Sequence, residues 1–388
     1  MQYLLNTYSR FDVKFEKGLN ATLWDEKGES YIDFTSGIGV VSVGHGNERL
    51  SNVICDQAKN IIHISNLYRI EQQEKLAEEI VKKSDIKGGV FFCNSGAEAN
   101  ETALKIARKY GEVNGEIKRY KVITLENSFH GRTISTLKAT GQPKFHQYFG
   151  PFPDGFTYAK DIADIKNKID DKTVAVMIEL IQGEGGVNPF DKKEIQDLAG
   201  FLKEKDILLI VDEVQTGIYR TGEFLASNLY EIKPDIVTLA KGLGGGVPIG
   251  AVLTTLTDVL KPGDHGSTFG GNYLATSAAL EVIRLLDEEK RNGRLAETIE
   301  YFENKLLKIA KEYPEMFESV SGYGLMRALR AKRPEIRDEV VKKSFENKLL
   351  VLKAGSHSVR FLPPLTISKE EIDEGFDRLK ITLNSLGS

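Results

Sequence analysis

Cysteine is scarce in this chain, and so are long apolar runs. Only two cysteines, Cys55 and Cys93, occur in 388 residues, which is too few for a disulfide framework and fits a reducing compartment. No run of about 18 apolar residues occurs, so the sequence offers no membrane-spanning helix. The first residues also lack the charged and then apolar pattern of a leader peptide. We therefore expect a cytoplasmic protein that does not bind a membrane.

A strong excess of one charge is also missing. The formal net charge is -4 and no basic patch stands out, which argues against a nucleic-acid partner. The six histidines, His130 among them, show no metal-ligand spacing, so we expect no metal site and interpret them as structural or incidental. What is present is ample apolar content, 41%, in a chain longer than one ordinary domain.

The middle of the chain alternates short apolar runs with helical stretches. These runs are rich in Val and Ile and lack alternation, as expected for strands buried on both faces. Predicted strands are Gly89–Cys93, Lys121–Leu125, Thr173–Leu180, Ile207–Val211, Asp235–Ala240 and Ile249–Leu253. Predicted helices at Glu98–Tyr110 and Asp191–Lys205 separate some of them, which indicates an α/β fold with an open, mostly parallel sheet.

One connection is too short for a parallel crossover. Only Lys241–Pro248 joins the last two predicted strands, whereas a parallel crossover needs about a dozen residues. These two strands are therefore expected to be antiparallel, or not to be neighbours.

The two ends of the chain have a different texture. A hairpin is predicted at Ala21–Asp25 and Tyr31–Phe34. After residue 272 we expect a strand pair around Tyr323–Leu329 and Leu349–Leu352, together with long charged helices at Leu274–Asp287, Gly293–Tyr313, Arg337–Asn347 and Ser368–Leu386. This predicts a large domain of residues 51–272 and a smaller α+β domain built from residues 1–50 and 273–388.

A candidate anion site follows the first of the predicted central strands. Ser95 and Glu98 have the spacing of a capping box, which marks a helix N-terminus. Free backbone amides of Gly96 and Ala97 would face the end of the sheet, and the helix dipole favours an anion there. Capping boxes are common, so the alternative is a plain capped helix.

Two further polar signals follow apolar strands. Asp212 and Glu213 end one strand, where a carboxylate can ligate Mg²⁺, pair with a buried cation or simply face water. Lys241 ends another and precedes a glycine-rich turn; a lysine in such surroundings becomes a usable nucleophile, although a lone lysine more often reaches solvent. Pyridoxal phosphate needs an anion site, an acid and a Schiff-base lysine together, so the three signals strengthen one another.

Six segments then carry a resemblance to a known family. They are Asn94–Glu101, Ser128–Thr133, Asp212–Gly217, Ala240–Gly250, Ser267–Asn272 and Val359–Leu365. Together they resemble the class III aminotransferases, which use pyridoxal 5'-phosphate. The resemblance implies a fold-type I transferase with a mostly parallel seven-stranded sheet, one strand of it antiparallel, plus a smaller α+β domain.

The resemblance also implies a role for particular residues. Lys241 would carry the cofactor and move a proton, and Asp212 would pair with its ring nitrogen. Thr268 would reach the phosphate bound by the partner subunit of a homodimer with shared active sites. The other implied cofactor contacts are Ser95, Gly96 and Ala97 at the phosphate, Phe129 and Val214 on the ring faces, and Gln215 at the ring hydroxyl.

Substrate binding is implied in the same way. Arg132 and Arg360 would bind carboxylates, Glu184 would mask the second arginine, and Ser267 would lie near the substrate. The implied reaction moves the δ-amino group of N2-acetylornithine to 2-oxoglutarate, with ornithine, 4-aminobutyrate, succinylornithine and succinyl-diaminopimelate as alternative donors. The chain departs from the usual pattern at Gly39, Leu180, Ser267, Tyr273 and Arg327. Of these, Gly39 and Tyr273 are expected to line or flank the substrate site.

Overall fold

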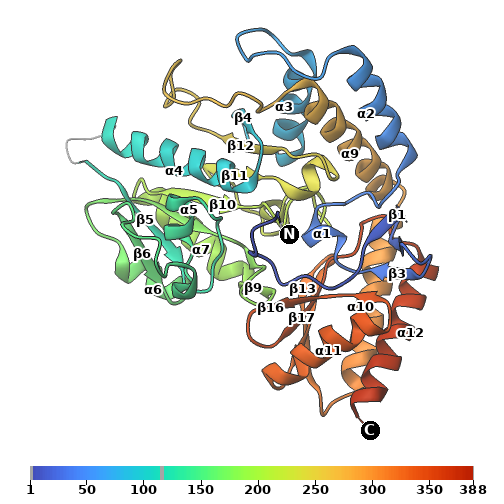
Figure 1. The fold of residues 1–388 in the computed structure, drawn as a ribbon. Coiled ribbons are helices and arrows are strands. Elements are labelled where there is room, and N and C mark those ends of the chain that lie inside the picture. The colour runs from blue at the N-terminus through green and yellow to red at the C-terminus, as the bar shows by residue number, and fades with distance from the viewer. Residues whose placement is uncertain (1–2, 114–117, 388) are drawn as a thin grey trace.

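Seven strands form the main sheet of the computed structural model, which describes residues 3–113 and 118–387 (Figure 1). Across the sheet the strands are ordered β4 (Gly89–Cys93), β12 (Gly250–Thr254), β11 (Ile236–Leu239), β10 (Leu208–Asp212), β7 (Thr173–Ile178), β5 (Lys121–Leu125) and β6 (Phe156–Ala159). β12 runs antiparallel to both of its neighbours, and the other pairs are parallel. The predicted mostly parallel sheet with one antiparallel strand is confirmed.

Apart from shifts of one residue at the ends of β10, β11 and β12, the sheet differs from the sequence prediction in two details. β6 was not among the predicted strands, because it is a short edge strand whose Phe-Thr-Tyr-Ala sequence lacks a Val and Ile run. β7 ends at Ile178, two residues before the predicted Leu180. Glu179 therefore directly follows a fully buried strand.

Helices cover both faces of this sheet, as the alternation of strand side chains requires. In β7, Ala175 and Met177 pack in the cluster that holds Ala103 and Ile106 of α4, while Val176 packs in a separate cluster with side chains of α7. The helices are α1 (Ser36–Gly39), α2 (Glu48–Asn60), α3 (Glu71–Ser84), α4 (Gly96–Val113), α5 (Ile134–Ala139), α6 (Ile162–Lys168), α7 (Lys192–Glu204), α8 (Ala226–Leu229), α9 (Tyr273–Arg291), α10 (Arg294–Glu312), α11 (Pro334–Glu346) and α12 (Lys369–Leu386), with 3-10 turns η1 (Pro143–Phe145) and η2 (Lys241–Gly244).

The described residues also form three smaller sheets. The first has the order β1 (Phe15–Leu19), β2 (Thr22–Asp25), β3 (Ser30–Asp33), β15 (Leu349–Leu350); the second β13 (Phe317–Tyr323), β14 (Met326–Ala331), β17 (Ser358–Phe361), β16 (Leu352–Ala354); the third β8 (Ile181–Gln182), β9 (Asn188–Pro189). The N-terminal hairpin is confirmed as β2 and β3.

The predicted C-terminal strand pair is wrong. β15 pairs in parallel with β3 from the other end of the chain, whereas β14 lies between β13 and β17. Strand pairing between segments so far apart leaves no local signal in the sequence, because the hydrophobic pattern fixes which face is buried and not which neighbour is used.

One apolar cluster crosses the predicted domain boundary. Helices α2 and α3 pack against α9, and the three lie together in Figure 1. Leu76 and Ile80 of α3 share a buried cluster with Val282 of α9 and with Phe302 and Phe361 further along the chain. The division into residues 51–272 and residues 1–50 with 273–388 therefore remains a prediction.

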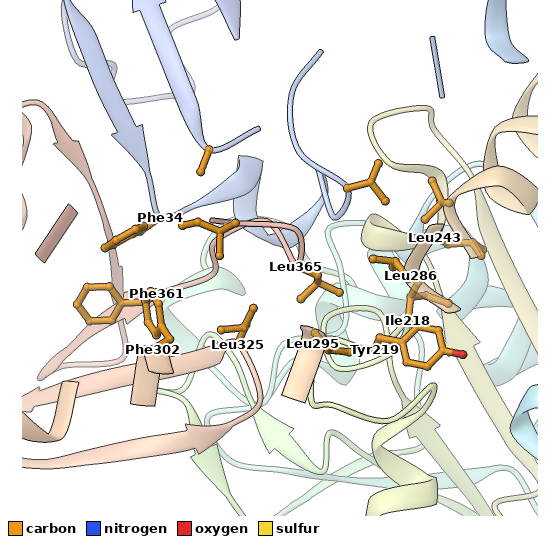
Figure 2. Packing of buried hydrophobic residues seen from close by; sticks show 14 of the residues in the cluster. Phe34, Ile218, Tyr219, Leu243, Leu286, Leu295, Phe302, Leu325, Phe361 and Leu365 are labelled. Carbon is orange, nitrogen blue, oxygen red and sulfur yellow. The ribbon is translucent and has the colours of Figure 1, made fainter. Parts of the chain in front are cut away.

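Phe34, Phe302 and Phe361 pack together in that cluster (Figure 2). Phe34 meets Phe302 edge to face at 5.2 Å between ring centroids, and Phe361 lies 6.1 Å from Phe302. Phe361 follows Arg360 on β17, so this packing fixes the strand that carries the predicted carboxylate binder. No helix of the described residues is long and apolar enough to cross a lipid bilayer.

A pair of helical glycines tests this packing. A methyl group added at Gly375 of α12 would overlap the ring of Phe34, whereas one added at Gly200 of α7 would meet no atom within 4 Å. We expect Gly375→Ala to lower the free energy of unfolding by about 1–3 kcal/mol through overpacking. Gly200→Ala should raise it by about 0.4–1 kcal/mol, since alanine is the better helix former. Chemical denaturation of both variants checks this; equal effects would contradict the packing.

Candidate active site

A cavity of about 390 Å³ opens at the carboxyl ends of the parallel strands. Five strands each deliver a wall residue at their last position or within a few positions after it: Asn94 after β4, Phe129 after β5, Glu179 after β7, Asp212 at the end of β10 and Lys241 after β11. Ligands of open α/β sheets bind at this edge. Of the predicted site residues, the wall contains Ser95, Gly96, Ala97, Phe129, Arg132, Glu184, Asp212, Val214, Gln215 and Lys241.

The N-terminus of α4 forms one end of this cavity. The Ser95 Oγ accepts a hydrogen bond from the Glu98 N–H at 3.2 Å, but the Glu98 carboxylate reaches the Asn94 N–H at 2.7 Å rather than that of Ser95. A Cβ at Gly96 would lie 2.7 Å from Val214, so only glycine lets the backbone lie this close. The first amides of a helix have no partner within it, and the dipole favours an anion there.

Asp212 is a buried carboxylate with an oriented shell of donors. Its Oδ2 accepts from the Asn100 amide at 2.8 Å and lies 2.8 Å from His130 Nδ1, and its Oδ1 accepts from the Val214 N–H at 3.0 Å. Asn100 is held in turn by Thr238, whose hydroxyl donates to the amide oxygen at 2.7 Å. A carboxylate held by three donors on this cavity wall is suited to pair with a cation inside it.

Glu213 points away from the cavity, because neighbouring residues at a strand end face opposite sides. Its carboxylate accepts from the backbone N–H groups of Ala226 and Ser227 at 2.6 and 2.7 Å and from the hydroxyls of Ser227 and Thr216. Of the two neighbouring acids, Asp212 therefore lines the cavity, whereas Glu213 caps the N-terminus of α8.

Lys241 is partly exposed, and it lines the cavity. Burial lowers the pKa of its amine, and the positive charge of Arg360 adds to this effect, while Glu184, Asp212 and Glu179 oppose it. Its φ of 44° is unusual for a side chain other than glycine, and such strain is found where function requires one geometry. The geometry and the electrostatics both suit a nucleophilic amine.

The turn that precedes Val40 explains one departure from the family pattern. Gly37, Ile38 and Gly39 all have positive φ angles, 64°, 66° and 74°, and Val40 then enters the cavity wall. Glycine adopts such angles without strain, so Gly39 fits this backbone better than alanine would. Gly39 flanks the cavity as the residue before Val40, whereas Tyr273 is not among the residues that line the cavity of its own chain.

Sequence analysis missed two titratable residues of the wall. It interpreted His130 as structural or incidental, but this buried ring bonds Asp212 and lines the cavity. Glu179 also lines the cavity; burial raises the pKa of its carboxyl to about 7, and Asp212 adds to this shift while His130 opposes it. A carboxylate directly after an apolar strand was a usable signal for Glu179, which the overlong predicted strand concealed.

Arg132 lines the cavity with its guanidinium over two aromatic rings. It lies 4.2 Å from the ring centroid of Phe145 and 5.4 Å from that of Phe129. Among the described residues no carboxylate lies within ion-pair distance of it. Stacking on aromatic rings leaves its N–H fork free for a carboxylate ligand.

Arg360 is 2% exposed and pairs with Glu184. Its Nη1 donates to Glu184 Oε1 at 2.6 Å and to Gln215 Oε1 at 3.3 Å, while its buried Nε has no partner among the described residues. Burial raises the pKa of the Glu184 carboxyl, but the opposing effect of Arg360, assisted by Lys241 and Arg132, is larger, so the net shift is downward. The pair is therefore ionic, and it lies beside Lys241.

Three predicted residues lie outside this wall, and one of them is Arg360. Ser267 borders it, because the Asn94 amide donates to its hydroxyl at 3.2 Å. Thr268 is exposed and is not brought into the cavity of its own chain. Leu180 and Arg327 are buried elsewhere, Arg327 in an ion pair with Glu303 at 2.6 Å.

These residues fit pyridoxal phosphate. The helix N-terminus offers the anion site, Asp212 the acid and Lys241 the amine, and all three line one cavity. The described residues contain no group of three or more His, Cys, Asp or Glu placed to hold a metal ion.

Comparison with known proteins gives a consistent family. The profile of the family Aminotransferase class-III matches residues 4–383. The acetylornithine aminotransferase of Wolinella succinogenes is 58% identical, covering 99% of this chain and 98% of that protein, and that of Aquifex aeolicus is 48% identical, covering 98% and 99%. Among solved structures, ornithine aminotransferase from Toxoplasma gondii has a TM-score of 0.92 at 34% identity, covering 99% and 93% of the two chains. N-acetylornithine aminotransferase from Stenotrophomonas maltophilia has a TM-score of 0.83 at 33%, covering 98% and 97%.

The lowered pKa of Lys241 leads to a test of its reactivity. Because its amine loses its proton at a lower pH than an ordinary lysine, we expect borohydride to fix pyridoxal phosphate on Lys241 in preference to surface lysines near neutral pH. Peptide mass spectrometry locates the label, and an exposed lysine such as Lys193 serves as the internal control. Lys241→Ala should remove the label and turnover; wild-type turnover in this variant would disprove the assignment.

Proposed function

The chain belongs to the class-III aminotransferases, which use pyridoxal phosphate, and from this premise we propose that it moves the δ-amino group of N2-acetylornithine to 2-oxoglutarate. The products are N-acetylglutamate 5-semialdehyde and glutamate, and the step belongs to arginine biosynthesis. The names of the relatives from Wolinella and Aquifex support this donor. Ornithine, 4-aminobutyrate, succinylornithine and succinyl-diaminopimelate are the alternative donors.

The cofactor, when bound, withdraws electrons from the carbon that carries the amino group and so makes its proton acidic. Lys241 is the group that takes this proton on Nζ and returns it. Asp212 would pair with the ring nitrogen and keep it protonated, since a neighbouring carboxylate favours the charged form. Asn100 and His130 support that role, because they hold Asp212 Oδ2 in one orientation.

The remaining cofactor contacts follow the cavity wall. Ser95, Gly96 and Ala97 would hold the phosphate at the N-terminus of α4. Phe129 and Val214 would cover the two faces of the ring, and Gln215 would bind its hydroxyl group. The close approach of Gly96 to the side chain of Val214 supports this arrangement, since it places the proposed phosphate loop beside a residue proposed to cover the ring.

The ion pair of Arg360 and Glu184 is the observation on which the proposal mainly rests. The donor's reacting end is an uncharged methylene bearing an amine, beside which a bare Arg360 would be a costly unpaired charge. Glu184 neutralises Arg360 for this donor and moves away when glutamate brings a second carboxylate. Arg132, which has no carboxylate partner among the described residues, binds the α-carboxylate of acetylornithine and a carboxylate of glutamate.

A homodimer with shared sites completes the proposal. Thr268 is exposed next to Phe269, which is 59% exposed, and nearby Leu67 is 87% exposed. Asn66 ties the two loops together by donating to the Ser267 carbonyl at 3.0 Å. These apolar side chains support a partner subunit at this surface, where Thr268 would reach the partner's phosphate.

The cysteines support a cytoplasmic location, because Cys55 and Cys93 form no disulfide.

Asp212→Asn tests the acid without changing its shape. An amide cannot stabilise a positively charged ring nitrogen, so we expect the variant to bind cofactor yet to lose roughly 30- to several-thousand-fold in kcat, as for loss of about 2–5 kcal/mol at a buried charge. Stopped-flow kinetics and the cofactor absorbance separate the two effects. A kcat close to that of the wild type would contradict this role.

Glu184→Ala and Arg360→Ala test the choice of donor. Single-turnover rates are measured separately with acetylornithine, with glutamate and with each alternative donor. We expect Glu184→Ala to favour glutamate, and Arg360→Ala to impair glutamate, by roughly 30-fold or more, because each removes one buried charge interaction worth about 2–5 kcal/mol.

The ratio of the single-turnover rates with acetylornithine and with glutamate decides this test. Equal impairment of both donors by Arg360→Ala, with an unchanged ratio in Glu184→Ala, would leave Arg360 with a purely structural role. A higher kcat/KM of the wild type for one of the alternative donors would overturn the assignment of acetylornithine.

A further inference from the structure

Glu179 is a buried carboxylate that the roles proposed above leave unused. It follows β7 directly, is 6% exposed and lines the cavity together with Asp212 and Lys241. Taking a carboxylate out of water costs free energy unless its oxygens are well paired. The partners of Glu179 therefore indicate what it does.

Each oxygen of Glu179 accepts from a different segment. Oε2 accepts from the Phe129 N–H at 3.1 Å, and Oε1 accepts from the Gly183 N–H at 3.4 Å. Phe129 begins the segment that carries Arg132, and Gly183 directly precedes Glu184. One side chain thus joins the segment of the unpaired arginine to the segment that masks Arg360.

The backbone around Glu184 is held on both sides. Gly183 packs against the side chain of Gln215 so closely that an added Cβ would overlap it. On the other side, the Glu184 carbonyl accepts from the Gly355 N–H at 2.9 Å. Glu179 accepts from the Gly183 N–H, so the backbone that carries Glu184 is held in place. The Glu184 side chain therefore extends toward Arg360 from a fixed position.

We propose that Glu179 is a positioning residue that holds Glu184 over Arg360 and so sets the preference between the two amino donors. The inference rests on the proposed function, in which Glu184 masks Arg360 for one donor and releases it for the other. A carboxylate can accept from both N–H groups, whereas an amide has one oxygen and must turn its own NH₂ toward the other N–H. Glutamine at this position therefore keeps the shape and breaks one of the two ties.

Glu179→Gln is the test, with single-turnover rates measured for acetylornithine and glutamate on the holoenzyme. Loosening Glu184 should lower the acetylornithine-to-glutamate ratio of kcat/KM by about tenfold, as expected for the loss of one hydrogen bond, in the same direction as Glu184→Ala. A residue that only stabilised the fold would lower both rates together and leave the ratio unchanged, which would overturn the proposal.

Glu213→Gln is the matched control. Glu213 is also buried, also follows a central strand and also accepts from two backbone N–H groups, but these belong to α8 and not to a substrate segment. We expect it to lower Tm without changing the donor ratio. An equal change of ratio in this control would overturn the proposal. If Glu179→Gln does not fold, Glu179→Asp supplies the same measurement, because its shortened side chain also loses reach.

The double variant Glu179→Gln/Glu184→Ala separates this inference from the proposed function. With Glu184 absent, Glu179→Gln should change the donor ratio no further, since the two act through one group. A further change of the donor ratio in the double variant would overturn the role of Glu179 but would leave the masking function of Glu184 intact. An unchanged ratio in Glu184→Ala itself would instead remove the masking function, and the role of Glu179 with it.

Discussion

Charges removed from water must be compensated, and this constraint organises the whole cavity. Asp212, Glu179 and Arg360 are at most 6% exposed, and each is held by hydrogen bonds or an opposite charge from another part of the chain. An uncompensated charge of this kind would cost several kcal/mol. The site is therefore a set of paired groups around Lys241, whose own amine is pushed toward the neutral form by the same burial.

The sheet satisfies that constraint by placing the ends of distant segments side by side. Parallel strands deliver their carboxyl ends to one edge, so Asp212, Glu179 and Lys241 become neighbours without special loops. The single antiparallel strand, β12, makes room for the short glycine-rich turn after Lys241, since no helical crossover has to return the chain. The antiparallel strand and the position of Lys241 are thus consequences of one connection.

Much of the fold was predictable from the sequence, because its strands and helix ends rest on local signals. The central strands, the antiparallel pair, the N-terminus of α4 and the helix ending at Leu386 all follow from apolar runs, caps and connection length. Pairing across the chain did not follow: β15 joins β3, and Arg360 meets Glu184 across 176 positions. No periodicity or spacing encodes such contacts, and only resemblance to a family brought those two residues together.

The residues that sequence reasoning missed share a physical cause. Neither residue type nor spacing indicates a role for Glu179, or for His130 within the segment Ser128–Thr133. His130 holds Asp212, and Glu179 holds two backbone amides. A strand boundary misplaced by two residues was enough to turn Glu179 from a strand-end acid into an interior one. Supporting groups of this sort can be identified only once their hydrogen bonds are known, because the partners of a buried polar atom indicate its role. In this chain the partners of Glu179 lead from the cavity wall to Gly183, the residue before Glu184.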